Sequence, residues 1–293
     1  MAQVITDKES TLEQLQNAYC PTEIRYRPED SPFQYLLADI THRCNMACRN
    51  CYIPVRNLPD LPVEWLYDVL GKLTRRHRIR LVGAEPTMRE DLPEIIANVR
   101  QLGHIPIVLT NGLKLANPDY VSELKAAGLR TIYLSMNGGL RDDLYKAIDN
   151  LFCAERKLKA LDHILENRML PTIGMILVRG INDSHLPEFL RYLLSRGLRD
   201  IHLRSVGPMG DYIDVPPYDL EEMEAILRAA LGDDASQLEL SQAEGSSRDF
   251  RLGNAEIQLT QWPDLGSLSR GRIAPDGFLE PVFESFVANQ NEY

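Results

Sequence analysis

The feature that most constrains the fold of this chain is a regular alternation of short apolar runs with amphipathic segments. Each apolar run has the length of a strand and is bounded by polar or turn-forming residues, which is typical of a buried strand. The intervening segments repeat apolar residues at the spacing of one helix face. The predicted strands are residues 35–41, 79–82, 105–109, 131–135, 172–178 and 201–205. Helices are predicted near residues 62–73, 92–99, 117–128, 158–165, 186–197 and 220–231.

Six strand–helix units in succession predict an α/β fold with right-handed crossovers and a parallel sheet. The periodicity alone is compatible with an open doubly wound sheet and with an incomplete barrel. In both architectures, ligands bind beyond the carboxyl ends of the strands. Functional residues are therefore expected in the loops that follow Thr41, Val82, Leu109, Ser135, Val178 and Ser205.

The strand–helix rhythm ends near residue 232, and the chain beyond it has a different character. Residues 232–253 are polar, whereas Ile257 and Leu259 indicate a strand and Pro275-Asp276-Gly277 indicates a turn between extended runs. We therefore divide the chain into an N-terminal arm (1–32), a barrel (33–232) and a small C-terminal β-rich extension (233–293). The extension is expected to cover the barrel mouth and to shape the substrate pocket.

Charge and hydropathy exclude several classes of protein. With 42 acidic against 32 basic residues, the formal net charge is −10, which disfavours general binding to nucleic acid or to an anionic membrane. No apolar run approaches the roughly 20 residues of a membrane span, and residues 1–17 lack the apolar core of a signal peptide. The chain is expected to be cytoplasmic, where disulfides are rare.

Three of the five cysteines stand together directly after the first predicted strand. Cys44, Cys48 and Cys51 have the spacing C-x3-C-x2-C, which places three thiolates on one loop where they can bind one soft metal centre. The loop lacks the fourth ligand of a structural zinc site, so a zinc alternative needs a distant residue such as His42. Three cysteines also leave one iron of a cubane [4Fe–4S] cluster open to a substrate or cosubstrate.

With this motif in this place, the sequence resembles the radical S-adenosylmethionine (SAM) superfamily, whose hallmark is C-x3-C-x2-C after the first strand of a partial (β/α)6 barrel. The resemblance covers about residues 33–230. It implies a TIM-like partial barrel, a [4Fe–4S] cluster held by the three cysteines, and SAM on the open iron. Further segments resemble strand-end motifs of the molybdenum-cofactor and peptide-maturing branch. They are Gly83-Ala84-Glu85-Pro86, Thr110-Asn111-Gly112, Ser135-Met136-Asn137-Gly138 and residues 178–183.

The resemblance also implies which strand-end residues contact SAM. Glu85 would accept a hydrogen bond from the SAM amino group, beside the backbone of Gly83, where the missing side chain lets the backbone approach the ligand. Ala84 stands where the family has a second glycine. Ser135 and Asn137 would bind the ribose or the carboxylate.

Three more residues are candidates for the same site. Many relatives carry an aromatic residue or histidine before the third cysteine, whereas this chain has Asn50 there and Tyr52 after the cysteine. Both are therefore candidates for the adenine contact. Arg204 ends the sixth predicted strand and is a candidate for the SAM carboxylate or an anionic substrate group, because a guanidinium can bind either one bidentately. A salt bridge is the alternative for Arg204.

The mechanism that the resemblance implies is reductive. An external one-electron donor reduces the cluster, SAM is cleaved to methionine and a 5′-deoxyadenosyl radical, and the radical abstracts a hydrogen atom from substrate. Arg43, Arg49 and Arg56 flank the cysteine loop and are candidates for docking an acidic flavodoxin or a ferredoxin-type donor. Ordinary solvated charge is the alternative for these arginines.

Two cysteines remain, Cys20 and Cys153. Residues 273–282 resemble the hairpin that precedes an auxiliary-cluster cysteine in relatives, but Val282 stands where that cysteine would be. The extension is therefore expected to hold no cluster. Cys153 follows the fourth strand and is a candidate hydrogen-atom donor to a substrate radical. The alternative for Cys153 is a small buried apolar residue.

These observations predict a radical SAM enzyme with one [4Fe–4S] cluster and a polar small-molecule substrate from a biosynthetic pathway. The lack of auxiliary-cluster cysteines favours redox-neutral outcomes such as epimerisation or rearrangement. The N-terminal arm is expected to be too short for a peptide-leader-binding domain, and a peptide maturase is the alternative within enzymes. A non-catalytic iron–sulfur or zinc scaffold is the alternative outside enzymes.

Overall fold

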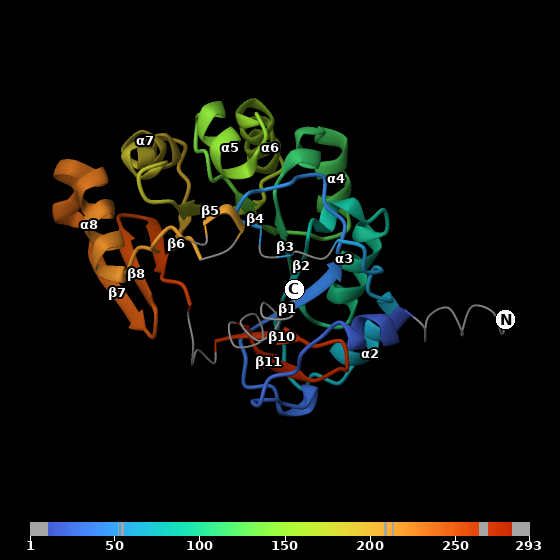
Figure 1. Ribbon diagram of the computed structural model, residues 1–293. Helices are drawn as coiled ribbons and strands as arrows, with labels where there is room; N and C mark the ends of the chain where they lie inside the picture. Colours follow the sequence, from blue (N-terminus) through green and yellow to red (C-terminus); the bar gives the residue numbers. More distant parts are fainter. Residues whose placement is uncertain are drawn as a thin grey trace, which may run out of the picture.

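The computed structural model describes residues 11–51, 53, 56–207, 210–212, 214–263 and 269–282. Within them, one sheet of eleven strands carries the fold, in the order β11-β10-β1-β2-β3-β4-β5-β6-β9-β8-β7 (Figure 1). The strands are β1 (Tyr35–Thr41), β2 (Arg78–Gly83), β3 (Ile105–Thr110), β4 (Thr131–Ser135), β5 (Leu170–Leu177), β6 (Asp200–Ser205), β7 (Glu239–Glu244), β8 (Ser247–Leu252), β9 (Ala255–Thr260), β10 (Arg270–Ile273) and β11 (Leu279–Pro281). The helices are α2 (Val63–Gly71), α3 (Leu92–Gln101), α4 (Pro118–Ala126), α5 (Asp142–Asp149), α6 (Ala154–Glu166), α7 (Leu186–Ser195) and α8 (Leu220–Leu231).

Strands β1 to β6 lie side by side in chain order, and all five pairings between them are parallel. At least one helix connects each strand to the next, and the helices lie along the outside of the curved sheet (Figure 1). In the part of the chain that the structure describes, β1 and β6 do not pair with each other, so the barrel is open between them. The predicted α/β fold, a partial (β/α)6 TIM-like barrel, is confirmed.

The strands after residue 232 join both edges of this barrel. Strand β9 pairs parallel with β6 and continues into antiparallel β8 and β7. At the opposite edge, β10 pairs parallel with β1, and β11 pairs antiparallel with β10. The β-rich C-terminal region therefore lengthens the barrel sheet at both ends. As a result, Thr260 of β9 and Arg270 and Arg272 of β10 line the barrel interior.

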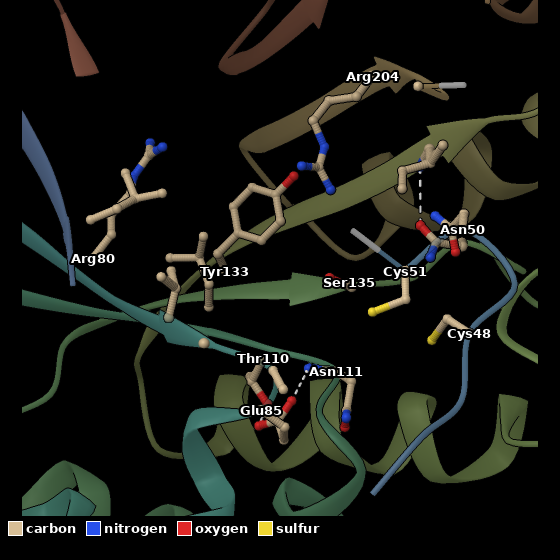
Figure 2. Close-up of a pocket in the computed structure, with 18 of the residues that line it drawn as sticks. Cys48, Asn50, Cys51, Arg80, Glu85, Thr110, Asn111, Tyr133, Ser135 and Arg204 are labelled. Carbon is tan, nitrogen blue, oxygen red and sulfur yellow. Dashed lines mark hydrogen bonds between the residues drawn. The ribbon is translucent and has the colours of Figure 1, made fainter. Parts of the chain in front are cut away.

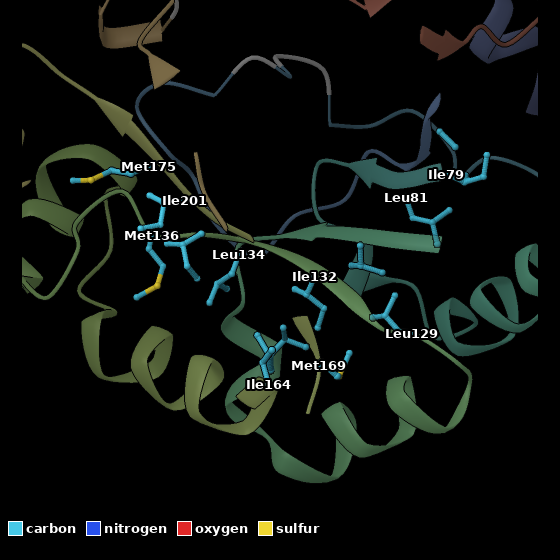
Figure 3. Close-up of a cluster of buried hydrophobic side chains, with 14 of the residues drawn as sticks. Ile79, Leu81, Leu129, Ile132, Leu134, Met136, Ile164, Met169, Met175 and Ile201 are labelled. Carbon is cyan, nitrogen blue, oxygen red and sulfur yellow. The ribbon is translucent and has the colours of Figure 1, made fainter. Parts of the chain in front are cut away.

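An apolar layer between the sheet and the helices forms the main core (Figure 3). Strand residues such as Leu81, Ile132 and Leu134 share this layer with residues of α6 and its following turn, such as Ile164 and Met169. These side chains are at most 2% exposed, and burying each contributes about 1.5–3 kcal/mol. The core thus occupies the outer side of the sheet, which leaves the inner side available for polar groups.

Helix starts follow local signals in the sequence. Asn117 caps α4 by accepting a hydrogen bond from the backbone N–H of Asp119, with Pro118 at the first helical position. Asp219 and Glu222 form a reciprocal capping box at the start of α8. Among the described residues, no helix combines the length and the hydropathy needed to cross a bilayer.

Candidate active site

The cysteine loop leaves the carboxyl end of β1, and Cys44, Cys48 and Cys51 line one cavity of about 280 Å³ (Figure 2). Arg56 holds the loop by donating to the Met46 carbonyl at 2.8 Å and to the Cys51 sulfur at 3.0 Å. The backbone N–H of Met46 donates to the Cys44 sulfur at 3.3 Å. Two of the three sulfurs therefore already receive hydrogen bonds, as sulfur ligands of metal centres commonly do.

Burial controls the protonation of these thiols. It raises the pKa of Cys44, and it raises the pKa of Cys48 strongly, with a further contribution from the nearby Asp149 carboxylate. Such thiols ionise when a metal centre binds them. No group of three or more His, Cys, Asp and Glu side chains among the described residues could hold a single metal ion. Three separate cysteine ligands suit a cluster whose irons each take one cysteine, and the zinc alternative is not tested by this geometry.

Glu85 joins the ends of β1, β2 and β3 (Figure 2). Its Oε1 accepts hydrogen bonds from the Thr87 N–H at 3.1 Å, the Thr87 hydroxyl at 2.6 Å and the Thr110 hydroxyl at 2.6 Å. Its Oε2 accepts from the Asn111 N–H at 2.7 Å, and its own N–H donates to the Arg43 carbonyl at 2.9 Å. The residue is only 1% exposed, so this carboxylate positions the strand ends. Its expected contact with the SAM amino group stays a prediction.

Gly83, which precedes this segment, is required by strand packing. It has a φ of +144°, and a Cβ atom there would clash with the Thr41 carbonyl oxygen of β1. The N–H of Ala84 donates to that same carbonyl at 2.9 Å. We expected Gly83 for close approach of a ligand, whereas the contact with β1 already accounts for glycine at this position.

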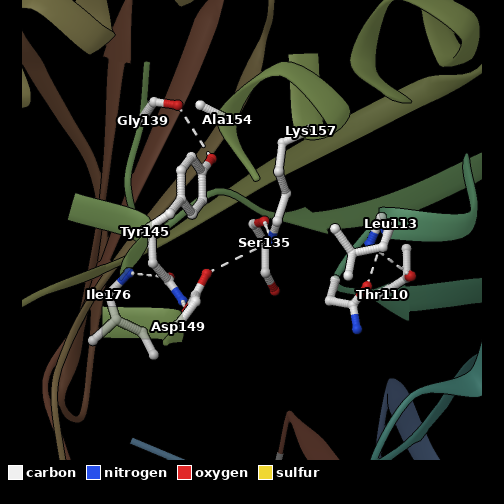
Figure 4. Close-up of polar contacts among 12 residues, drawn as sticks. Thr110, Leu113, Ser135, Gly139, Tyr145, Asp149, Ala154, Lys157 and Ile176 are labelled. Atoms are coloured by element: carbon white, nitrogen blue, oxygen red, sulfur yellow. Dashed lines mark hydrogen bonds and ion pairs between the residues drawn. The ribbon is translucent and has the colours of Figure 1, made fainter. Parts of the chain in front are cut away.

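Ser135 and Asn137 belong to a buried polar network with Lys157 and Asp149, two residues that were not predicted from the sequence (Figure 4). The charges of Asp149 and Lys157 both act on Cys48. The ammonium of Lys157 donates to the Ser135 carbonyl at 2.8 Å and lies 3.7 Å from Asp149 Oδ2. The Asn137 side chain donates to Asp149 Oδ1 at 2.8 Å and accepts from the Ile176 N–H at 3.0 Å. Asp149 Oδ2 is buried and accepts no hydrogen bond from the described residues.

Lys157 and Asp149 are each 1% exposed, and both line the cavity. A signal for Lys157 was available, because it stands between Ala154 and Leu161 on the buried face of α6. A lysine on an apolar helix face is costly to bury without a partner. Such a position therefore indicates a buried carboxylate or ligand close by.

The cavity brings together most of the predicted site residues. Besides the three cysteines, its lining includes Asn50, Gly83, Ala84, Glu85, Ser135, Asn137 and Arg204. Tyr52 lies outside the described residues. The Arg204 guanidinium lies over the Tyr133 ring at 5.6 Å, and its Nε is buried without a hydrogen-bond partner among the described residues. Arg204 forms no salt bridge with the described residues. Its predicted contact with a ligand stays a prediction.

Cys153 is not part of this lining. It precedes α6 and packs in a small apolar cluster with Met46, Leu113 and Tyr145. Burial raises the pKa of its thiol to about 11. This environment is typical of a small buried apolar residue, and the role of Cys153 as a hydrogen-atom donor stays a prediction.

The three arginines near the loop all have partners within the chain. Arg43 pairs with Asp60 at 2.5 Å, and Arg49 pairs with Asp211 at 3.3 Å. Arg56 donates hydrogen bonds to the Met46 carbonyl and the Cys51 sulfur of the cysteine loop. The docking of a flavodoxin or a ferredoxin-type donor on these arginines stays a prediction.

Residues 39–193 match the family model of the radical SAM superfamily. That segment begins in β1 and contains the three cysteines, Glu85 and the Lys157 network described above. The chain belongs to the radical SAM superfamily. Enzymes of this superfamily use a [4Fe–4S] cluster together with SAM, and solved structural neighbours of the chain contain SAM.

Individual relatives differ in the reactions that their names state. The 7,8-dihydro-6-hydroxymethylpterin dimethyltransferase of Methanocaldococcus jannaschii is 32% identical over 169 residues, which are 53% of this chain and 32% of that enzyme. The GTP 3',8-cyclase of Petrotoga mobilis is 27% identical over 278 residues, which are 86% of this chain and 82% of the cyclase. SuiB of Streptococcus suis, solved with SAM, has a TM-score of 0.63 at 14% identity, over 85% of this chain and 60% of SuiB. The chain thus spans less than two thirds of the dimethyltransferase and of SuiB, and SuiB shows likeness of fold.

The residues of this radical SAM site fit both cofactors. Three cysteine sulfurs line one cavity, and three protein ligands leave one iron of a [4Fe–4S] cluster open. The buried Asp149 Oδ2 without a hydrogen-bond partner lines the same cavity. A carboxylate oxygen buried in this way calls for a donor from a ligand. The amino group and the ribose hydroxyls of SAM are such donors.

Replacing Arg56 by glutamine is expected to make the cluster harder to reduce. The substitution removes the positive charge of Arg56 and the hydrogen bond that Arg56 donates to the Cys51 sulfur. Both interactions favour the more negative, reduced cluster. The midpoint potential should fall by about 60 mV, the one-electron equivalent of roughly 1.4 kcal/mol. An anaerobic redox titration followed by electron paramagnetic resonance measures it. Arg43→Gln is the control, and equal shifts in both variants would contradict a specific role of Arg56.

Proposed function

We propose that this enzyme cleaves SAM reductively to a 5′-deoxyadenosyl radical and abstracts a hydrogen atom from a polar small molecule of a biosynthetic pathway. The observation that carries the proposal is a single cavity whose lining contains three kinds of residue. The cysteines suit the cluster, and the polar strand ends suit SAM. The arginine-rich barrel interior suits a polar substrate placed within reach of the radical.

In this proposal, Cys44, Cys48 and Cys51 hold the cluster, which supplies the electron for cleavage of SAM. The remaining work belongs to the protein, which binds and orients SAM and excludes water. Asp149 Oδ2 accepts a donor group of SAM, and Lys157 at 3.7 Å balances the charge of that carboxylate. The Ser135 side chain makes no hydrogen bond to the described residues and is therefore available to the ribose.

Asn137 has a different part in the site. Both ends of its side-chain amide are used within the protein, by Asp149 and by the Ile176 N–H. We therefore infer that Asn137 positions Asp149 and leaves direct contact with SAM to other groups. Glu85 likewise positions the backbone of residues 83–85, whose carbonyl groups can accept from the SAM amino group.

The small-molecule substrate is favoured by the relative that this chain matches over most of its length, which is named for a reaction of GTP. A peptide maturase is the second candidate, supported by the likeness of fold to SuiB bound to its precursor peptide, with a TM-score of 0.66. A redox-neutral outcome is favoured because only Cys20 and Cys153 remain for further metal binding, and Cys153 lies in an apolar cluster.

Transfer of deuterium from substrate to 5′-deoxyadenosine tests the substrate class. The host organism is grown in deuterated medium, and its extract is separated by ultrafiltration into a small-molecule fraction and a peptide fraction. Each fraction is incubated anaerobically with the reconstituted enzyme, unlabelled SAM and dithionite. The small-molecule fraction should yield 5′-deoxyadenosine that is one mass unit heavier, because the abstracted atom is deuterium.

The Cys48→Ala variant is the matched control and should form no labelled product. Label that appears only with the peptide fraction would establish the maturase alternative. The absence of label with either fraction would reject hydrogen abstraction from a cellular substrate.

A further inference from the structure

The interior of the barrel, beyond the cysteines, carries an unusual number of cationic side chains. Arg80 from β2, Arg204 from β6, and Arg270 and Arg272 from β10 all line the cavity. Arg272 pairs with Asp39 at 2.6 Å. An ordinary TIM-like barrel fills this space with branched apolar side chains. The substitution of charge for an apolar core indicates that this space receives a ligand.

Arg80 and Arg204 carry the argument, because neither has an acidic partner among the described residues. The Nε atom of each is buried without a hydrogen-bond partner there. Each is in contact with an aromatic ring instead, Arg80 with Tyr35 at 4.4 Å and Arg204 with Tyr133 at 5.6 Å. A ring face attracts a cation but leaves the N–H donors in the plane of the guanidinium unused. The N–H donors of both guanidinium groups therefore remain available to a ligand.

The surroundings of Arg80 disfavour its charge but do not remove it at neutral pH. Burial lowers the pKa of Arg80 to about 10, and the charges of Arg270 and Arg204 contribute to that shift. Even so, Arg80 stays charged at neutral pH. A charged side chain whose Nε is buried without a partner among the described residues is unfavourable, and an anion bound in the cavity would stabilise it.

An uncharged hydrogen-bond network of Tyr133, His202 and Thr260 lines the cavity beside these arginines. The Tyr133 hydroxyl lies 3.2 Å from His202 Nδ1, and His202 Nε2 lies 2.9 Å from the Thr260 hydroxyl. Burial and the neighbouring arginines keep the pKa of His202 far below its usual value. Tyr133 reaches this position because Gly174 has no side chain, and a Cβ atom there would clash with the Tyr133 ring. In Figure 2, Tyr133 lies between Arg80 and the cysteines, with Arg204 beside it.

We propose that Arg80 and Arg204 bind a phosphate or diphosphate group of the substrate, with the rest of the substrate directed toward the cysteines. Two guanidinium groups on β2 and β6, without acidic partners, are balanced by a dianion and only half balanced by one carboxylate. Guanidinium forks also match the oxygens of phosphate bidentately. This inference rests on the proposed function, and it narrows the substrate to phosphorylated small molecules.

Binding of inorganic pyrophosphate to the reconstituted full-length enzyme with SAM tests this proposal. Isothermal titration calorimetry should detect binding, and the affinity should fall at least tenfold in Arg80→Gln and in Arg204→Gln. Arg76→Gln removes the same charge from an exposed position and should change the affinity less than twofold. Equal affinity in the wild type and both cavity variants would overturn the proposal. Tighter binding of succinate than of pyrophosphate would also overturn it, because a carboxylate would then be the preferred ligand.

Thermal unfolding separates a binding role of Arg80 from a structural one. Arg80→Met keeps the length of the side chain and removes a buried charge without an acidic partner. Its melting temperature without pyrophosphate should equal or exceed that of the wild type, and pyrophosphate should no longer raise it. A lower melting temperature in this variant would show that Arg80 supports the fold and would overturn the proposal. Pyrophosphate binding by a wild type that does not cleave SAM would refute the proposed function alone.

Discussion

Replacing Cys48 with alanine is expected to abolish assembly of the iron–sulfur cluster and to reduce SAM cleavage at least about 100-fold. That loss should exceed the 10–100-fold that removal of an outer-shell partner of a metal ligand typically costs. Cys48 is one of three sulfurs in the cavity, and alanine supplies no ligand for iron in its place. Iron and sulfide content after anaerobic reconstitution, together with 5′-deoxyadenosine formation, measure the effect.

Cys153→Ala is the matched control for this substitution. Cys153 is a cysteine near the loop as well, but it packs in an apolar cluster and does not line the cavity. The variant should keep its iron content and its cleavage of SAM. Loss of the cluster in Cys153→Ala, or a full cluster in Cys48→Ala, would contradict the assignment of the three ligands.

Replacing Glu85 with alanine is expected to lower the free energy of unfolding by about 3–5 kcal/mol. The substitution removes an acceptor of four hydrogen bonds and leaves the buried N–H group of Thr87 and the partly buried N–H group of Asn111 without this partner. Each stranded donor costs about 1–3 kcal/mol. Thermal unfolding should show a melting temperature lower by roughly 6–15 °C for a chain of this size.

Glu90→Ala provides the comparison for Glu85→Ala. Glu90 is exposed in the same connection between β2 and α3, and surface substitutions of this kind usually change stability by less than about 0.5 kcal/mol. A melting temperature of Glu85→Ala within 2 °C of that of Glu90→Ala would contradict the positioning role of Glu85, on the scale expected for such losses.

The strands of the barrel could be predicted closely because their signals are local. The expected strand at residues 131–135 coincides with β4, and the strand expected at 201–205 differs from β6 by one residue. The cysteine motif and the Gly-Ala-Glu-Pro segment could also be placed, since parallel strands bring their carboxyl ends together. Helix α5 was missed because its buried residues Leu144, Tyr145 and Ile148 occupy only two turns, too few to repeat a pattern.

Other features depend on contacts that a local pattern does not contain. The sequence predicts strands after residue 232, but their partners β6 and β1 lie far away along the chain. Arg204 was a candidate contact from the sequence, but Arg80 of the interior was missed for a related reason. Arg80 alternates with the buried Ile79 and Leu81, and the pattern alone does not tell whether its face of the sheet meets solvent or the barrel interior.

The central claim of radical SAM chemistry is tested most directly by one measurement. The full chain is reconstituted anaerobically with iron and sulfide and incubated with SAM and dithionite, and the products are quantified by mass spectrometry. We predict about four irons per chain for a cubane cluster, with 5′-deoxyadenosine and methionine formed in equal amounts. A chain that is fully loaded with iron yet forms no 5′-deoxyadenosine, even with the small-molecule fraction of its host, would contradict the claim.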